Sequence, residues 1–284
     1  MKRVRIIAAT LIAFSFIACN EEDLNEESID AQVTEADISS EQSADATYEE
    51  IDDIVEEGIL IAPDNGRSEM GRGESLRCAE VSHDEENKII EIVFDGTCEG
   101  AGGHVKSGKV IITCNDRRYI PGSFRSVTFE DFFFDDVQVE GTRTITNISE
   151  SIESAIVFNI KTEGGKLTFP DGTFISREAD HTRTWERATS PLNDVVRLIG
   201  NASGVRRDGV AYTSDITTEL VFQASCIASG TARIPVSGVK ELNWNDNSLI
   251  VDFGDGTCDN LASFTLNGVT VEKEVNPRGH RNRR

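Results

Sequence analysis

The 284-residue chain contains few histidines and none of the compact catalytic motifs. Its four histidines are His83, His104, His181 and His280. It has no Gly-x-Ser-x-Gly, His-Glu-x-x-His, Cys-x-x-Cys or Walker sequence, which argues against an elbow hydrolase, a zinc protease or a P-loop enzyme. We therefore expect no catalytic residue, metal or cofactor and favour a non-catalytic protein. A carboxylate-only mechanism such as glycoside hydrolysis stays open as an alternative.

Long hydrophobic runs are also missing. The longest apolar stretch, Ile6 to Ala18, has thirteen residues, whereas a membrane-spanning helix needs about 20. It follows the basic residues Lys2, Arg3 and Arg5, and this order is typical of a cleavable export signal. Residues 1–18 are therefore predicted to be a signal peptide.

The end of this stretch carries a modification signal. Phe16-Ile17-Ala18-Cys19 resembles the bacterial lipobox, in which the cysteine becomes the acylated first residue of the mature protein. The resemblance implies a lipoprotein anchored in a lipid bilayer through Cys19, because several acyl chains together bind a membrane stably. The alternative is a chance cysteine at the end of a secretory signal.

Basic residues are absent between Asn20 and Gly66, where seventeen residues are Asp or Glu. Such a segment repels itself and buries little, so residues 19–75 are predicted to form a disordered acidic tether. Its start, Asn20-Glu21-Glu22-Asp23, resembles the signal that sends lipoproteins of the Bacteroidota to the outer face of the outer membrane. We expect display on the cell surface; an orientation toward the periplasm is the alternative.

One short helix is predicted within this tether, over about residues 47–57. Thr47 and Glu50 fit a capping box, and Gly58 is placed to end the helix. The remaining pattern is an apolar stripe formed by Tyr48, Ile51, Ile54, Val55 and Ile59. Because the polar face is wholly acidic, we expect this helix to dock on the β domain or on a partner.

Residues 76–275 show an all-β pattern, with short Val, Ile, Thr and Phe runs separated by turns. The pattern predicts an antiparallel meander or sandwich. The predicted turns lie at Asp95-Gly96, Gly164-Gly165, Asp171-Gly172, Asp208-Gly209, Asp255-Gly256 and Asn267-Gly268. Residues 276–284 are predicted to be a disordered basic tail.

One alternating segment, Thr173 to Glu186, is apolar on neither face. It is predicted to be an edge strand, or a strand wetted on both sides, because charges protect exposed edges. One face carries Arg177, His181, Arg183 and Trp185, a weak candidate site for a sugar or an anionic group.

An internal repeat relates the two ends of the domain, at about 78–113 and 226–271. Asp95-Gly96-Thr97-Cys98 recurs as Asp255-Gly256-Thr257-Cys258, and Gly108 and Gly268 each follow ten residues after the cysteine. In both units we predict a strand, a tight turn and a second strand. The second strands are predicted over Val110 to Thr113 and Val269 to Val271.

In an oxidising compartment this repeat favours the disulfides Cys78–Cys98 and Cys226–Cys258. The pair Cys98–Cys114 is a competitor. Otherwise Cys114 is expected to be a buried spare thiol.

These segments resemble a large group of uncharacterised β-rich lipoproteins from the Bacteroidota. The similarity is carried by Asp252 to Asn260 with Asn267-Gly268, by Val139 to Asn147, and by Asp95 to Cys98 with Gly108. It implies a secreted β-rich lipoprotein and no particular activity.

Charge narrows the possible partners. The acidic domain disfavours nucleic acid. Calcium at Asp246, Asp252, Asp255 and Asp259 is a minor alternative to hairpin turns. We therefore predict a non-catalytic structural or binding module with a surface glycan or protein as its partner. The alternative is a glycan-binding accessory protein or a carbohydrate-active enzyme.

Overall fold

The computed structural model describes residues 35–61, 76, 79–99, 104–153, 155–232 and 234–275. These residues form one long helix, α2 (Glu35–Ile61), followed by a β-sheet with a one-turn helix η4 (Pro191–Asn193) and a short helix α3 (Ala224–Ser229). The strands are β1 (Ala79–Asp84), β2 (Ile89–Glu99), β3 (Val105–Cys114), β4 (Phe124–Phe134), β5 (Val137–Asn147), β6 (Ile156–Thr168), β7 (Phe174–Glu186), β8 (Val195–Val205), β9 (Ala211–Gln223), β10 (Ser237–Trp244), β11 (Asn247–Asp255), β12 (Leu261–Leu266) and β13 (Val269–Glu274).

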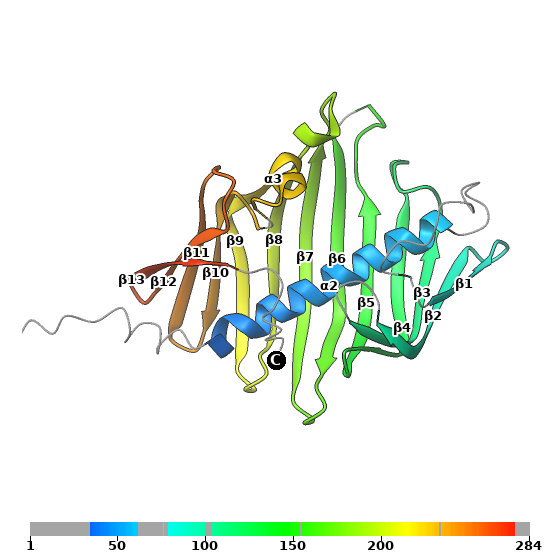
Figure 1. The fold of residues 1–284 in the computed structure, drawn as a ribbon, viewed down its shortest axis with the longest axis horizontal. Coiled ribbons are helices and arrows are strands. Elements are labelled where there is room, and N and C mark those ends of the chain that lie inside the picture. Colours follow the sequence, from blue (N-terminus) through cyan, green and yellow to red (C-terminus); the bar gives the residue numbers. More distant parts are fainter. Residues whose placement is uncertain are drawn as a thin grey trace, which may run out of the picture.

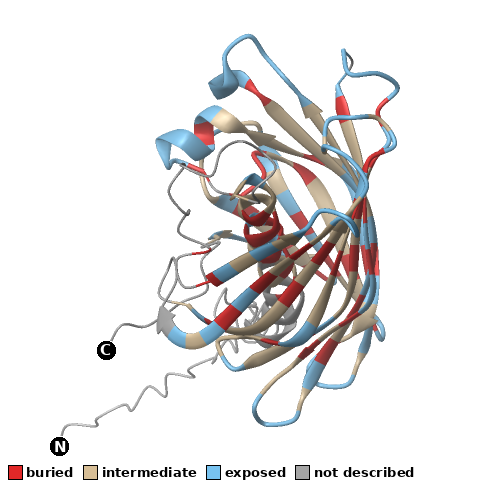
Figure 2. Ribbon diagram, turned by 90° about the vertical axis from the view of Figure 1, so that its right-hand side faces the viewer, coloured by how far each residue is buried: buried red, intermediate tan, exposed pale blue. Residues whose placement is uncertain are grey.

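The strands form a single 13-stranded sheet in chain order. Every strand pairs antiparallel with its neighbours in the sequence. The antiparallel meander predicted from the turn spacing is therefore confirmed. The sheet bends strongly, and its hollow side faces helix α2 (Figures 1 and 2).

Three of the six predicted turn dipeptides lie between consecutive strands, and a fourth, Asp255-Gly256, lies at the end of β11. Asp171-Gly172, Asp208-Gly209 and Asn267-Gly268 lie between β6 and β7, β8 and β9, and β12 and β13. Asp95-Gly96 lies inside β2 at a register shift, so the turn predicted there is wrong. Gly164-Gly165 likewise lies inside β6 at a register shift opposite β7, so the turn predicted there is also wrong. A Cβ atom on Gly165 would lie 2.5 Å from the Tyr48 hydroxyl of helix α2. The glycine serves close packing against the helix.

Helix α2 crosses the hollow side of the sheet diagonally (Figure 1). It is longer at both ends than the predicted segment 47–57, and Thr47 lies inside it instead of capping it. Its apolar stripe is confirmed: Tyr48, Ile51, Ile54 and Val55 are buried against the sheet, and Ala44 continues the stripe one turn earlier. Of the two predicted alternatives, docking on the β domain or on a partner, the structure shows the first.

Gly58 does not end the helix, contrary to the prediction. It lies inside the last turn, buried, where a Cβ atom would approach Ile92 Cδ1 to 2.5 Å and Ile112 Cδ1 to 3.7 Å. The absent side chain lets the helix backbone lie close to strands β2 and β3. Within one core cluster, helix side chains pack with buried residues of the first seven strands, so α2 is part of the folded unit.

The two repeat units lie toward opposite ends of the sheet, and their Asp-Gly-Thr segments have the same local structure. Asp95 and Asp255 each accept hydrogen bonds from the backbone N–H and the hydroxyl of the threonine two residues later. The two predicted second strands are present, since Val110 to Thr113 lies in β3 and Val269 to Val271 lies in β13. The second unit differs from the prediction in having an additional strand, β12, before Gly268.

One of the two predicted disulfides is present. Cys226 in α3 is bonded to Cys258 after β11, which closes a loop of 32 residues and stabilises the fold by about 3–4 kcal/mol in the loop-entropy model. Cys78 and the side chain of Cys98 lie outside the described residues. Cys114 is a free, half-buried thiol, so the competing pair Cys98–Cys114 is wrong.

Candidate functional site

Strand β7 lies in the middle of the sheet, paired with β6 on one side and β8 on the other. The predicted edge position is therefore wrong. Its charged inner face is tolerated because helix α2 brings carboxylates to it, which supply the opposite charges that buried guanidinium groups require. The candidate site is the polar contact between α2 and the inner face of the sheet.

The most buried pair in this contact is Asp52 with Arg143. Arg143 Nε donates to Asp52 Oδ1 at 2.7 Å and Nη2 donates to Oδ2 at 2.8 Å, while Nη1 donates to Thr162 Oγ1 at 3.0 Å. Only 7% of Asp52 and 6% of Arg143 are exposed. Burial alone would raise the pKa of Asp52, but the charge and hydrogen bonds of Arg143 outweigh it and lower that pKa.

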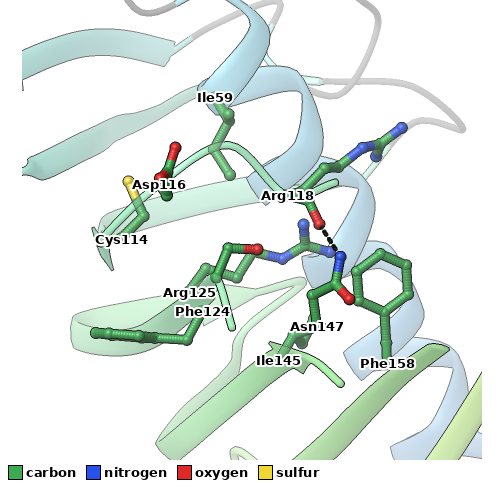
Figure 3. A pocket seen from close by; sticks show the side chains of 10 residues that line it. Ile59, Cys114, Asp116, Arg118, Phe124, Arg125, Ile145, Asn147 and Phe158 are labelled. Carbon is green, nitrogen blue, oxygen red and sulfur yellow. Dashed lines mark hydrogen bonds between the residues drawn. The ribbon is translucent and has the colours of Figure 1, made fainter. Parts of the chain in front are cut away.

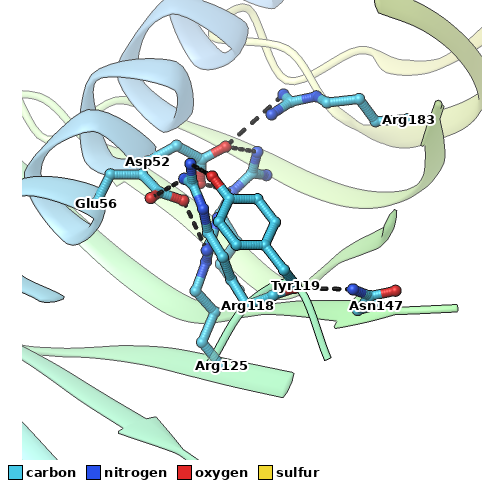
Figure 4. Close-up of polar contacts among 8 residues, drawn as sticks. Asp52, Glu56, Arg118, Tyr119, Arg125, Asn147 and Arg183 are labelled. Carbon is cyan, nitrogen blue, oxygen red and sulfur yellow. Dashed lines mark hydrogen bonds and ion pairs between the residues drawn. The ribbon is translucent and has the colours of Figure 1, made fainter. Parts of the chain in front are cut away.

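Glu56, one turn later, joins two further arginines (Figure 4). Arg125 Nη1 lies 2.6 Å from Glu56 Oε1, and Arg118 bonds the other carboxylate oxygen. Arg118 also donates to the Tyr119 hydroxyl and stacks over the Tyr119 ring, with its guanidinium carbon 4.5 Å from the ring centroid. The loop between β3 and β4 is thereby fixed to the helix.

Asp45 makes the corresponding contact in the N-terminal half of the helix. It accepts hydrogen bonds from Arg177 of β7 and from Lys240 of β10, the latter at 2.9 Å. Arg177 also donates to the Tyr212 hydroxyl at 3.3 Å. Burial would raise the pKa of Asp45, but the two cations lower it below its ordinary range.

The four residues predicted on β7 all lie on its inner side, but they have different roles. Arg177 is buried against Asp45. His181 is partly buried and interacts electrostatically with Asp45, Arg177 and Lys240. Arg183 lies at the margin of the helix contact, 3.9 Å from Asp52. The Trp185 indole N–H donates to Asp194 at 2.9 Å.

The sequence did not indicate Tyr119. Its ring lies 6.1 Å from that of Trp185, centroid to centroid, although 66 residues separate the two in the chain. Tyr119 belongs to a loop with no alternating pattern, so no signal in the sequence could have paired these rings.

A small cavity opens beside this cluster, at the C-terminal end of α2 (Figure 3). Its lining comprises Ile59, Cys114, Asp116, Arg118, Ser123, Phe124, Arg125, Ile145, Asn147 and Phe158. Burial raises the pKa of the Cys114 thiol, which disfavours the reactive thiolate.

A pH effect follows from His181. Burial, then the charges of Arg177 and Lys240, lower its pKa to about 4 from the ordinary value of about 6.5. Between these values the unfolded chain binds a proton that the folded chain does not, so this histidine costs stability as pH falls from 6.5 to 4. Between pH 7 and pH 4.5, His181 should lower the free energy of unfolding of the native chain by about 2 kcal/mol. His181→Gln should lack this contribution, which urea unfolding at the two pH values measures.

Glu49 changes the pH dependence of stability in the opposite direction. The unfolding free energy of His181→Gln therefore has to be compared with that of the native chain at each pH. Glu49 lies in the hollow of the sheet, where desolvation, then the charges of Asp45 and Asp52, raise its pKa to about 7. Folded Glu49 binds a proton earlier than the unfolded chain and gains stability as pH falls. If His181→Gln and the native chain lose equal stability on acidification, the assignment to His181 is wrong; His83→Gln in β1 is the matched substitution.

The part of the chain that the structure describes holds no cluster of metal ligands. There, no three His, Cys, Asp or Glu side chains gather as a metal site. Asp252, Asp255 and Asp259 each accept a hydrogen bond from the backbone N–H two residues later, as turn residues do. Across the same described segments, no helix has both the length and the apolar character needed to cross a bilayer.

Comparisons with protein-family models, with curated proteins and with solved structures find no match to this chain. The residues and their contacts therefore carry the functional inference.

Proposed function

We propose that this protein is a lipoprotein of the outer membrane, anchored through acylated Cys19, whose curved sheet and helix α2 form a non-catalytic structural or binding module. The observation that carries the module assignment is the pairing of Asp45, Asp52 and Glu56 with cations of the sheet. Carboxylates held in such ion pairs are poorly suited to give or take protons, and removing one partner of a buried pair destabilises a fold.

The anchor is supported by the order of basic residues, apolar stretch and Cys19, and the fold of the segment that follows limits how far the domain can lie from the lipid. Because α2 begins at Glu35, its first residue lies sixteen positions after Cys19, with fifteen residues between them. A fully extended chain of that length spans at most about 55 Å. The docked helix would hold the domain within that distance of the lipid surface, closer than the predicted tether of residues 19–75 would.

Acylation can be tested in cells given an alkyne-labelled fatty acid. The full-length protein should incorporate the label, and Cys19→Ser should lose it completely, because the thiol is the acylation site. Cys114→Ser is the matched control, since Cys114 is also a free thiol and its removal should leave labelling intact. Labelling that persists in Cys19→Ser, or that is lost only in Cys114→Ser, would disprove the proposed anchor.

Surface display is tested separately by protease treatment of intact cells. Cleavage of the labelled protein without lysis supports an outward orientation, and protection until lysis supports the periplasmic one. Replacing Glu21, Glu22 and Asp23 with alanine should abolish cleavage in intact cells while labelling continues.

A further inference from the structure

The aromatic pair Tyr119 and Trp185 forms a fixed surface at the margin of the helix contact. The two rings are inclined by 47°, and 40% of Tyr119 is exposed. Both polar groups are already bonded within the protein: Trp185 donates to Asp194, and the Tyr119 hydroxyl accepts from Arg118. These bonds hold the rings in place. Because the Arg118 guanidinium stacks over one face of the Tyr119 ring, a sugar ring would pack its C–H face on the exposed remainder of this ring and on Trp185.

Positive charge is in surplus beside these rings. Four guanidinium groups, of Arg118, Arg125, Arg143 and Arg183, share the two carboxylates of Asp52 and Glu56. Figure 4 labels three of these arginines, Arg118, Arg125 and Arg183. A negatively charged group would balance this surplus.

Arg183 has donors to spare at the surface. Both oxygens of Asp52 are already bonded by Arg143, and Arg183 reaches Asp52 Oδ2 only at 3.9 Å, beyond hydrogen-bond distance. One third of its side chain, 33%, is exposed. A guanidinium group offers five N–H donors arranged to bind a carboxylate through two parallel hydrogen bonds.

Arg183 and the aromatic rings are close enough for one ligand to contact both. Arg183 and Trp185 are two residues apart on β7, so both project from its inner face at a spacing of about 7 Å. We propose that Tyr119, Trp185 and Arg183 form a binding site for a carboxylate-bearing saccharide, with a sugar ring against the aromatic faces and its carboxylate on Arg183. This inference rests on the binding role in the proposed function and names its ligand class.

Two carboxylates border the site directly: Asp194 accepts the Trp185 indole N–H at 2.9 Å, and Asp52 lies 3.9 Å from Arg183. Glu49 also interacts electrostatically with Arg183. Its raised pKa of about 7 leaves its charge incomplete at neutral pH, which limits repulsion of an acidic sugar. Asp52 stays ionised but is neutralised by Arg143.

The test measures binding of oligogalacturonate to the purified full-length protein in detergent, by isothermal titration calorimetry. The methyl-esterified oligomer, which has the same sugar rings without the charge, is the comparison ligand. We expect the acid form to bind and the ester to bind at least tenfold more weakly, because the ester cannot pair with Arg183. This readout does not depend on acylation, so failure of the anchor and failure of the site are distinguishable.

Two variants separate the parts of the site. Arg183→Gln should weaken binding of the acid form about tenfold or more, and Tyr119→Ala about fivefold to tenfold. Their controls lie at other sites with equal exposure: Arg197→Gln on the outer face of β8 has a side chain 34% exposed, and Phe174→Ala at the start of β7 removes a ring 41% exposed. Circular dichroism should be used to check that each variant folds. If Arg183→Gln does not fold, Tyr119→Ala still tests the site, because it replaces only a surface ring.

Binding that weakens in the two site variants and persists in both controls supports the proposal. It is overturned if the native protein does not bind oligogalacturonate, if the ester binds as tightly as the acid, or if the controls weaken binding as much as the site variants do.

Discussion

An Asp52→Ala variant is expected to lower the free energy of unfolding by about 3–5 kcal/mol, because it leaves the Arg143 guanidinium buried without its counter-charge. Both groups are almost fully covered, and two of the three donors of Arg143 that bond side chains point at Asp52. Equilibrium unfolding in urea, followed by circular dichroism, measures the change. A loss below about 1 kcal/mol would show that water or another carboxylate replaces Asp52, contrary to the buried geometry.

Two controls separate the buried charge from the loss of a side chain. Lys161→Ala removes one partner of the ion pair with Asp180, in which both side chains are about half exposed, and should cost less than about 1 kcal/mol. The double variant Asp52→Leu with Arg143→Met replaces the pair with apolar groups. It should be more stable than Asp52→Ala alone, because no uncompensated charge remains in the core.

The sheet could be predicted from the sequence because its signals are local. Asp171-Gly172 and Asp208-Gly209 lie in hairpin turns, where positive φ is required, and the strands between such turns can pair only with their chain neighbours. The exceptions are also physical. Gly164-Gly165 has the composition of a turn, but its function is to admit the Tyr48 hydroxyl of a helix more than one hundred residues earlier.

The site could be predicted only in part, for the same reason. Alternation along β7 correctly placed Arg177, His181, Arg183 and Trp185 on one face. What that face contacts depends on pairs far apart in the chain, such as Arg177 with Asp45, 132 residues away, and no local pattern encodes such distances. A strongly acidic helix was visible in the sequence, but the arginines and lysines that match it are spread over β3, β4, β5, β7 and β10.

Removing helix α2 is expected to destabilise the protein more than any single substitution. A chain from which only residues 35–61 are deleted would expose the apolar inner side of the sheet, which Ile51, Ile54 and Val55 cover. It would also leave Lys106 and the buried arginines without the carboxylates of Glu50, Asp52 and Glu56. We expect this chain to lose its cooperative unfolding transition and to bind the dye ANS, because exposed apolar surface and loose packing produce both signals.

The helix should restore the fold when it is supplied as a separate peptide. A peptide of residues 35–61 carries the apolar stripe and the acidic groups that match the basic and apolar inner face of the sheet, as the helices of helix-in-groove complexes do. Addition of this peptide should suppress ANS binding and recover a cooperative transition, whereas a peptide with Asp45, Asp52 and Glu56 changed to Asn or Gln should bind at least tenfold more weakly. If the shortened chain unfolds with the native midpoint and gains nothing from the peptide, helix α2 is only a covering segment and the buried ion pairs do not hold the sheet in its curved form.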